Sequence, residues 1–176
     1  MAQNNSGNSR RQGRGSGLLR QGSRCPQALT IRFDRELRAH RGKLEFGPGP
    51  GEEVFAASFL ARREIVFDQA LLNHAPAFIN IVAHEIYHFV WRRLSNADRA
   101  AWALLLSREK TPLHPGLSSR LRFEAWRGGK SDRRWKDYVC EAFCDSAAAL
   151  SDPNSLISPQ RRRWLGNLMK RRSLPV

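Results

Sequence analysis

Apolar and polar residues alternate in the first third of the chain in the manner of short β-strands. Ala28–Phe33 alternates apolar and polar residues, and Lys43–Phe46 repeats the pattern briefly, as half-buried strands do. The glycines and prolines of Gly47–Gly51 then indicate a loop. Two further strands are expected at Val54–Leu60 and Glu64–Asp68, joined as a hairpin by the three residues between them.

Helical periodicity follows these strands. A helix is expected to begin near Pro76, because proline is favoured in a first turn, and to end around Leu94. Ser95 or Asn96 can cap a second helix that continues through Arg108. Its core side would hold Trp102, Leu105 and Leu106. Three more helices are expected: a short one at Arg120–Trp126, one that begins near Ser131 or Asp132 and includes Tyr138–Leu150, and an amphipathic one from about Ser158 to Lys170. The apolar face of the last, with Trp164, Leu165, Leu168 and Met169, should dock on the body of the protein rather than on a membrane.

The net charge of +14 lies at the two ends of the chain. Residues 1–24 contain five arginines and no acid, and residues 158–176 contain five arginines, one lysine and no acid, whereas the part between has 19 basic and 16 acidic residues. We therefore divide the chain into a disordered basic tail (1–24), one domain (25–157) and a basic amphipathic helix and tail (158–176). The basic ends suit nucleic acid or an acidic partner protein. Solvated tails without a partner are the alternative, and the sequence leaves both open.

The sequence contains no apolar run long enough for a membrane-spanning helix, and residues 1–24 lack the apolar stretch of a signal peptide. Three cysteines form no even disulfide framework. We therefore expect a cytoplasmic protein. Cys140 and Cys144 are interpreted as small buried apolar residues in preference to metal-ligating thiolates.

The most informative segment is His84-Glu85-Ile86-Tyr87-His88, an HExxH motif within an otherwise apolar helix. Histidines four residues apart lie on one helix face, so both can bind one zinc ion. Glu85 can then act as general base towards a zinc-activated water. A hydrolytic site of this kind needs a third protein ligand.

The expected helix at Tyr138–Leu150 offers that ligand. Glu141 and Asp145 are one turn apart on one face. The Glu141 carboxylate can complete a His84, His88, Glu141 zinc site with an open fourth position. Asp145 can accept the outer N–H of a ligand histidine and so fix the orientation of its ring. His114 is the alternative third ligand.

The HExxH motif followed by Glu141-x-x-x-Asp145 resembles the gluzincin branch of the zinc metallopeptidases and is similar to compact ImmA/IrrE-type peptidase domains, over roughly residues 65–150. Together with the order of the expected elements, the resemblance implies an α+β, zincin-like fold. In such a fold a short antiparallel or mixed N-terminal sheet packs on the active-site helix and on a second metal-bearing helix. It also implies that Glu64–Asp68 is an edge strand that pairs with an extended peptide.

The expected activity is zinc-dependent hydrolysis of a peptide or protein substrate, by a minimal metalloendopeptidase or a related regulatory protease. Two alternatives stay open. A SprT-like protease that acts on DNA-bound proteins would use His114 as third ligand, and its basic ends would contact DNA. A non-catalytic protein would bind zinc as a structural ion that stabilises the fold, and would use its basic ends to bind nucleic acid or protein.

Overall fold

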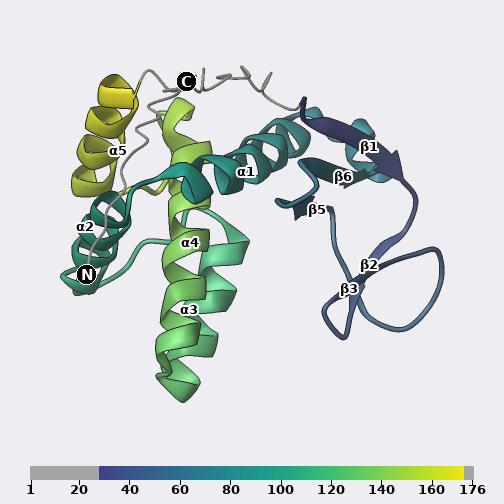
Figure 1. The fold of residues 1–176 in the computed structure, drawn as a ribbon, viewed down its shortest axis with the longest axis horizontal. Coiled ribbons are helices and arrows are strands. Elements are labelled where there is room, and N and C mark those ends of the chain that lie inside the picture. The colour runs from purple at the N-terminus through teal and green to yellow at the C-terminus, as the bar shows by residue number, and fades with distance from the viewer. Residues whose placement is uncertain (1–27, 173–176) are drawn as a thin grey trace, which may run out of the picture.

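Strands precede helices along the chain, and the two kinds of element occupy different sides of the molecule (Figure 1). A computed structural model describes residues 28–172, so the expected disordered tail at 1–24 lies outside the described residues. The strands are β1 (Thr30–Asp34), β2 (Leu37–His40), β3 (Lys43–Phe46), β4 (Glu52–Glu53), β5 (Ala56–Phe59) and β6 (Glu64–Asp68). The helices are α1 (Ala75–Arg93), α2 (Asn96–Ser107), α3 (Leu117–Gly129), α4 (Asp132–Ala148) and α5 (Pro159–Arg172), with short 3₁₀ turns η1 (Gln69–Asn73) and η2 (Ala149–Ser151). The expected α+β class is confirmed.

The strands form two small sheets. One is mixed, with the order β1-β6-β5: β1 is parallel to β6, and β5 is antiparallel to it. The other is antiparallel, with the order β3-β2-β4. The hairpin of β5 and β6 is confirmed, whereas β2 and β4 were not expected.

The expectation that β6 is an edge strand is wrong. β6 lies in the centre of its sheet, because β1 pairs with the side that the hairpin leaves free. Ile65, Val66 and Phe67 are all buried, at 1% exposure or less. Three consecutive buried apolar residues mark a strand that is covered on both faces. β5 is therefore an edge strand of this sheet.

Two hydrophobic clusters hold the domain together, and α1 contributes to both. Phe78, Ile81 and Phe89 of α1 pack against Ile65 and Phe67 of the sheet. The helical cluster is larger and has Trp102 and Phe143 at its centre, both fully buried. The Trp102 indole N–H donates to the carbonyl of Val139 at 3.0 Å, which satisfies a polar group that burial would otherwise leave unpaired.

The helices match the expected segments with one exception. Ser95 and Ser131 accept hydrogen bonds from backbone N–H groups in the first turns of α2 and α4, so the expected cap of α2 and the expected start of α4 are both confirmed. α5 docks on the body through Leu165, Leu168 and Met169, as expected. α3, expected as Arg120–Trp126, is longer at both ends. No described helix has the length and apolar character needed to cross a membrane.

Candidate metal centre

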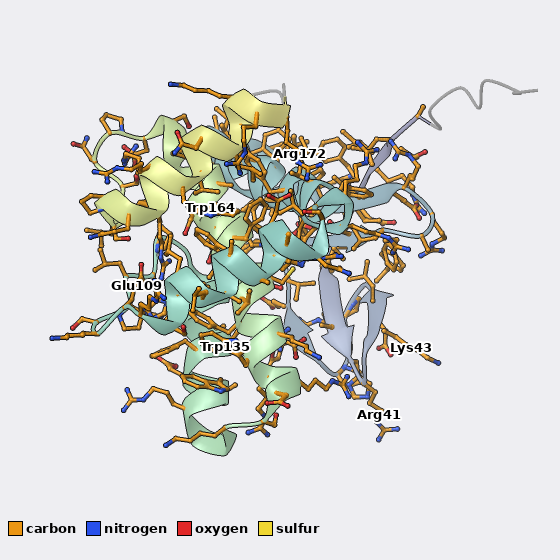
Figure 2. All side chains as sticks on the ribbon, turned by 60° about the vertical axis from the view of Figure 1, so that its left-hand side comes forward. Arg41, Lys43, Glu109, Trp135, Trp164 and Arg172 are labelled. Carbon is orange, nitrogen blue, oxygen red and sulfur yellow. The ribbon has the colours of Figure 1, made fainter. Side chains whose placement is uncertain are left out.

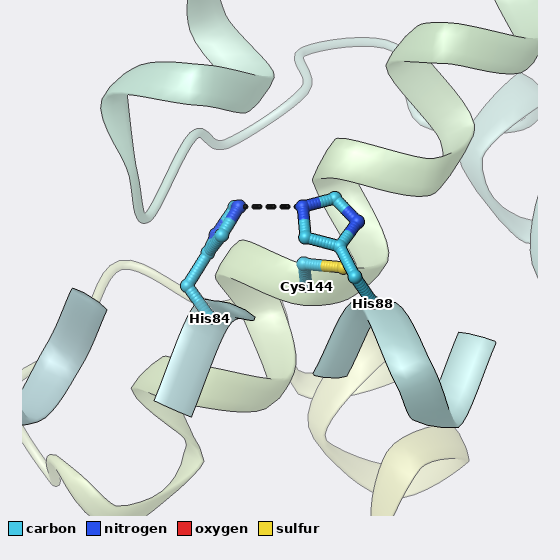
Figure 3. Close-up of side chains that lie close together, drawn as sticks. All are labelled: His84, His88 and Cys144. Atoms are coloured by element: carbon cyan, nitrogen blue, oxygen red, sulfur yellow. Dashed lines mark hydrogen bonds between the residues drawn. The ribbon is translucent and has the colours of Figure 1, made fainter. Parts of the chain in front are cut away.

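His84 and His88 face each other across one turn of α1. Their Nε2 atoms are 3.1 Å apart, and their rings are nearly perpendicular, at 75° (Figure 3). Two like imidazole nitrogens at this distance need a proton or a cation between them. The i, i+4 spacing of the motif thus produces a paired donor set, as the sequence predicts.

α4 crosses α1 and brings Glu141 to the same point. Glu141 Oε2 lies 3.2 Å from Nε2 of His84 and 3.7 Å from Nε2 of His88. A tetrahedral zinc site with metal–ligand distances near 2.05 Å has ligand–ligand distances of about 3.3 Å. The three measured separations, 3.1, 3.2 and 3.7 Å, scatter around that value. Two imidazoles and a carboxylate at these distances fit a zinc ion.

Asp145 connects His84 to a third helix. Its Oδ1 accepts from Nδ1–H of His84 at 2.7 Å, and its Oδ2 accepts from the backbone N–H of Ser119, in the first turn of α3, at 2.8 Å. Gly116, the residue before α3, leaves space for this carboxylate, because a Cβ there would lie only 2.3 Å from Asp145 Cγ. Asp145 therefore both orients a ligand histidine and caps α3 from outside that helix. This cap accounts for the earlier start of α3.

Glu85 follows His84 on α1 and is 8% exposed. The hydroxyl of Ser58, on the edge strand β5, donates to its Oε2. Sequence reasoning missed Ser58, since a serine within a strand is only a weak signal. The pattern does contain one hint, because Ser58 interrupts the apolar run of residues 54–60.

Two cysteines of α4 also border the histidines. The Sγ atom of Cys144 and one ring nitrogen from each of His84 and His88 lie within 4.8 Å of one another (Figure 3). Cys140 Sγ lies 3.7 Å from Nδ1 of His88. Burial raises the pKa of the Cys144 thiol well above its usual range. The pKa of Cys140 is lowered to about 6, because its thiol forms a hydrogen bond with Cys144 and lies next to His88. Glu141 and Cys144 are thus two candidate third donors beside the histidine pair, and a metal ion bound to Cys144 would deprotonate its thiol.

The charges of the site favour a cation. Burial lowers the pKa of His84, but the hydrogen bonds to Asp145 and Glu141 outweigh it and raise this pKa to about 10. Burial raises the pKa values of Glu141 and Asp145, but contact with His84 outweighs it and holds both below their usual range. The two carboxylates are therefore ionised and stabilise positive charge at the histidines, whether that charge is a proton or a metal ion.

His114 lies apart from the donor set. Its ring packs against Phe123 and Tyr138, with centroids 5.1 and 6.0 Å away. Within residues 28–172, no hydrogen bond or ion pair joins it to His84, His88 or Glu141. Burial, the largest effect, and the charge of Arg161 lower its pKa. This position does not favour His114 as third ligand.

Comparison of the chain with models of known protein families, with characterised proteins and with solved structures finds no match. The geometry of this site is therefore what bears on function.

Proposed function

We propose that the protein is a zinc-dependent peptidase with a zincin-like fold. One observation carries the proposal: donor atoms of His84, His88 and Glu141, from two helices, converge at the spacing of a tetrahedral zinc site. Three protein ligands leave one position open, which is the pattern of catalytic rather than structural zinc. Zinc bound there would lower the pKa of a water molecule and polarise the scissile carbonyl group.

Glu85 supplies the general base of the proposed reaction. The Ser58 hydroxyl bonds to Oε2 of its carboxylate, so Oε1 is left to accept the proton of the attacking water and to return it to the leaving amine. Ser58 thereby restricts the rotation of the carboxylate. A base held in one orientation loses less entropy on reaching the transition state than a freely rotating one.

Strand β5 offers a surface along which a peptide substrate can align. It pairs with β6 on one side and is at the edge of its sheet on the other. An extended peptide can add to such an edge through main-chain hydrogen bonds. Because Ser58 of this strand touches Glu85, a peptide paired there would pass close to the proposed base. The edge strand assigned to Glu64–Asp68 from sequence is thus replaced by Ala56–Phe59.

The compartment that suits this activity is the cytoplasm. Cys140 and Cys144 are both free thiols, and one of them contacts a proposed ligand histidine. Thiols remain reduced in the cytoplasm, whereas oxidising compartments favour disulfides.

The test combines metal analysis with three variants. Glu85→Gln should bind zinc like the natural protein and lose peptide hydrolysis by a factor of about 10² or more, because the general base is removed. Ser58→Ala should keep zinc and lower kcat while changing KM little. Ser58→Thr retains the hydroxyl and should recover most of the rate. Undiminished hydrolysis by Glu85→Gln would refute the mechanism.

A second function is favoured by the position of Cys144. If its thiolate joined His84, His88 and Glu141, four protein ligands would close the site, and the zinc would be structural. The protein would then be a non-catalytic binding module. X-ray absorption of the zinc-loaded protein separates the two functions, because a sulfur ligand is expected for the structural site and none for the peptidase.

A further inference from the structure

The excess positive charge of the described residues is concentrated in two helical segments. Residues 117–137, which form α3 and the first turns of α4, contain seven Lys and Arg against three Asp and Glu. α5 contains six Lys and Arg and no acid. The rest of residues 28–172 is close to neutral, with 12 basic and 13 acidic residues.

The charges of α5 are largely used within the fold. Arg161 is fully buried and pairs with Glu109 at 2.6 Å. Arg162 donates to the carbonyl of Leu150, and the last two arginines of the helix pair with Asp98. These side chains fasten α5 to its neighbours.

The charges of the α3–α4 hairpin have no such use. We call its exposed basic side chains the basic hairpin: Arg120, Arg122, Arg127, Lys130, Arg133, Arg134 and Lys136. Across the part of the chain that the structure describes, none of them forms an ion pair. Arg134 donates to the carbonyl of Ala125 at the end of α3, and Arg127 lies over the ring of Phe123. Seven cations against three acids leave a net charge of +4 on residues 117–137, and an anionic ligand would relieve the resulting repulsion.

Aromatic rings lie among these charges. Trp126 of α3 and Trp135 of α4 have ring centroids 4.9 Å apart, and both are partly exposed. Figure 2 shows Trp135 on this hairpin, away from Arg41 and Lys43 of the β2–β3 region. Partly exposed indoles between cations can stack with nucleobases while the cations neutralise phosphates.

We propose that the basic hairpin binds single-stranded nucleic acid. Five of its seven cations are arginines, whose planar guanidinium groups bind phosphate in bidentate fashion. A membrane surface is disfavoured, because the end of the hairpin, residues 127–134, has the sequence Arg-Gly-Gly-Lys-Ser-Asp-Arg-Arg and no apolar side chain to insert. An acidic protein would satisfy the cations but leave the indoles unused. The end of this surface is separate from the proposed metal centre, since Arg133 lies about 12 Å from Glu141 along the axis of α4.

The test compares two variants of the full-length chain with the same loss of charge. The hairpin variant is Arg120→Gln, Arg122→Gln and Arg133→Gln. The control is Arg41→Gln, Lys43→Gln and Arg93→Gln, at exposed positions outside the hairpin.

Affinity for labelled oligothymidylate of about 20 nucleotides is measured by fluorescence anisotropy as a function of salt. Loss of three phosphate contacts should make the slope of log affinity against log salt shallower by about two, which is a loss of about a hundredfold at 0.1 M salt.

The control variant should keep the natural affinity within about threefold, since distant cations contribute only weakly through screened charge. An equal loss in both variants would mean that binding follows net charge, and the proposal would be wrong. Tighter binding to a duplex of the same length would exclude the stacking role of the tryptophans. If polyglutamate or vesicles of anionic phospholipid bind more tightly than oligothymidylate, and the hairpin variant loses that binding, the partner is an acidic protein or a membrane and not nucleic acid. None of these measurements depends on zinc or peptide hydrolysis, so they stand apart from the test of the peptidase.

Discussion

Replacement of Gly116 by alanine tests the connection between the metal centre and α3 with a single added methyl group. The backbone of Gly116, with φ of −139°, is one that alanine also adopts, so the substitution introduces no backbone strain. The new Cβ would nevertheless lie 2.3 Å from Cγ and Oδ1 of Asp145 and 2.5 Å from its Oδ2. Non-bonded carbon atoms prefer 3.5–4.0 Å, so the carboxylate must move by roughly 1 Å or more.

The cost follows from the two hydrogen bonds that Asp145 makes at 2.7 and 2.8 Å. A displacement of 1 Å breaks or greatly weakens both, and a hydrogen bond to a charged group contributes about 1.5–3 kcal/mol. We therefore expect Gly116→Ala to lower the free energy of unfolding by about 3 kcal/mol, which corresponds to a fall in Tm of about 6–12 °C. Zinc affinity should fall by about 10- to 100-fold, because His84 loses the partner that orients its ring.

Chelator competition measures the zinc affinity, and thermal unfolding measures the stability. Gly128→Ala is the matched control: it adds the same methyl group to α3, where nothing lies within 4 Å of the new Cβ. It should leave zinc affinity unchanged and stabilise the protein by up to about 1 kcal/mol, because alanine is the better helix former. If Gly116→Ala behaves like Gly128→Ala in both assays, Asp145 does not link the metal centre to α3.

Three further predictions concern other parts of the molecule. Glu141→Gln should weaken zinc binding by about a hundredfold, which is about one quarter of the binding free energy of a site with four ligands. His114→Ala should leave zinc binding unchanged. The opposite pattern in chelator competition would make His114 the third ligand. Arg161→Met should destabilise the protein by about 3–5 kcal/mol in urea unfolding, because Glu109 is left without its partner, and Glu109→Leu added to it should recover most of the loss. The metal-free protein should be less stable at pH 10 than at pH 6. Since the folded-state pKa of His84 is raised to about 10 from 6.5, its contribution is complete below pH 6.5 and is lost as the pH rises through 10; a His84→Gln variant that shows the same decline would refute this cause.

The sequence predicts those parts of the fold that depend on local interactions. Helix α1 was expected to begin near Pro76 and end around Leu94, and it spans Ala75–Arg93. The serine caps of α2 and α4 also involve residues only three positions apart. For the same reason, the convergence of His84 and His88 follows from the geometry of one helix turn.

The parts that could not be predicted involve residues distant in the chain. The parallel pairing of β1 with β6 joins residues 34 positions apart, so the hairpin pattern of β5 and β6 gave no sign that β6 is central. Asp145 caps α3 across 26 positions, and Ser58 contacts Glu85 across 27. Such contacts depend on how packed elements meet, whereas periodicity reports only on one element at a time.

The sharing of α1 between two clusters has a consequence for the order in which the protein folds. All four residues assigned to the metal centre, His84, His88, Glu141 and Asp145, lie in the helical part, whereas Ser58 and the edge strand belong to the sheet. The metal centre requires α1 and α4 to meet across 61 positions, from His84 to Asp145, whereas β1 and β6 pair across 34. Closing the longer loop costs more entropy, so we expect the sheet to form no later than the metal centre. Pulsed hydrogen exchange during refolding in the presence of zinc should show protection of β6 together with or before that of α4, and earlier protection of α4 would contradict this order. A newly made chain would then present its edge strand before it can hold a metal, and hydrolysis would begin only when α4 docks.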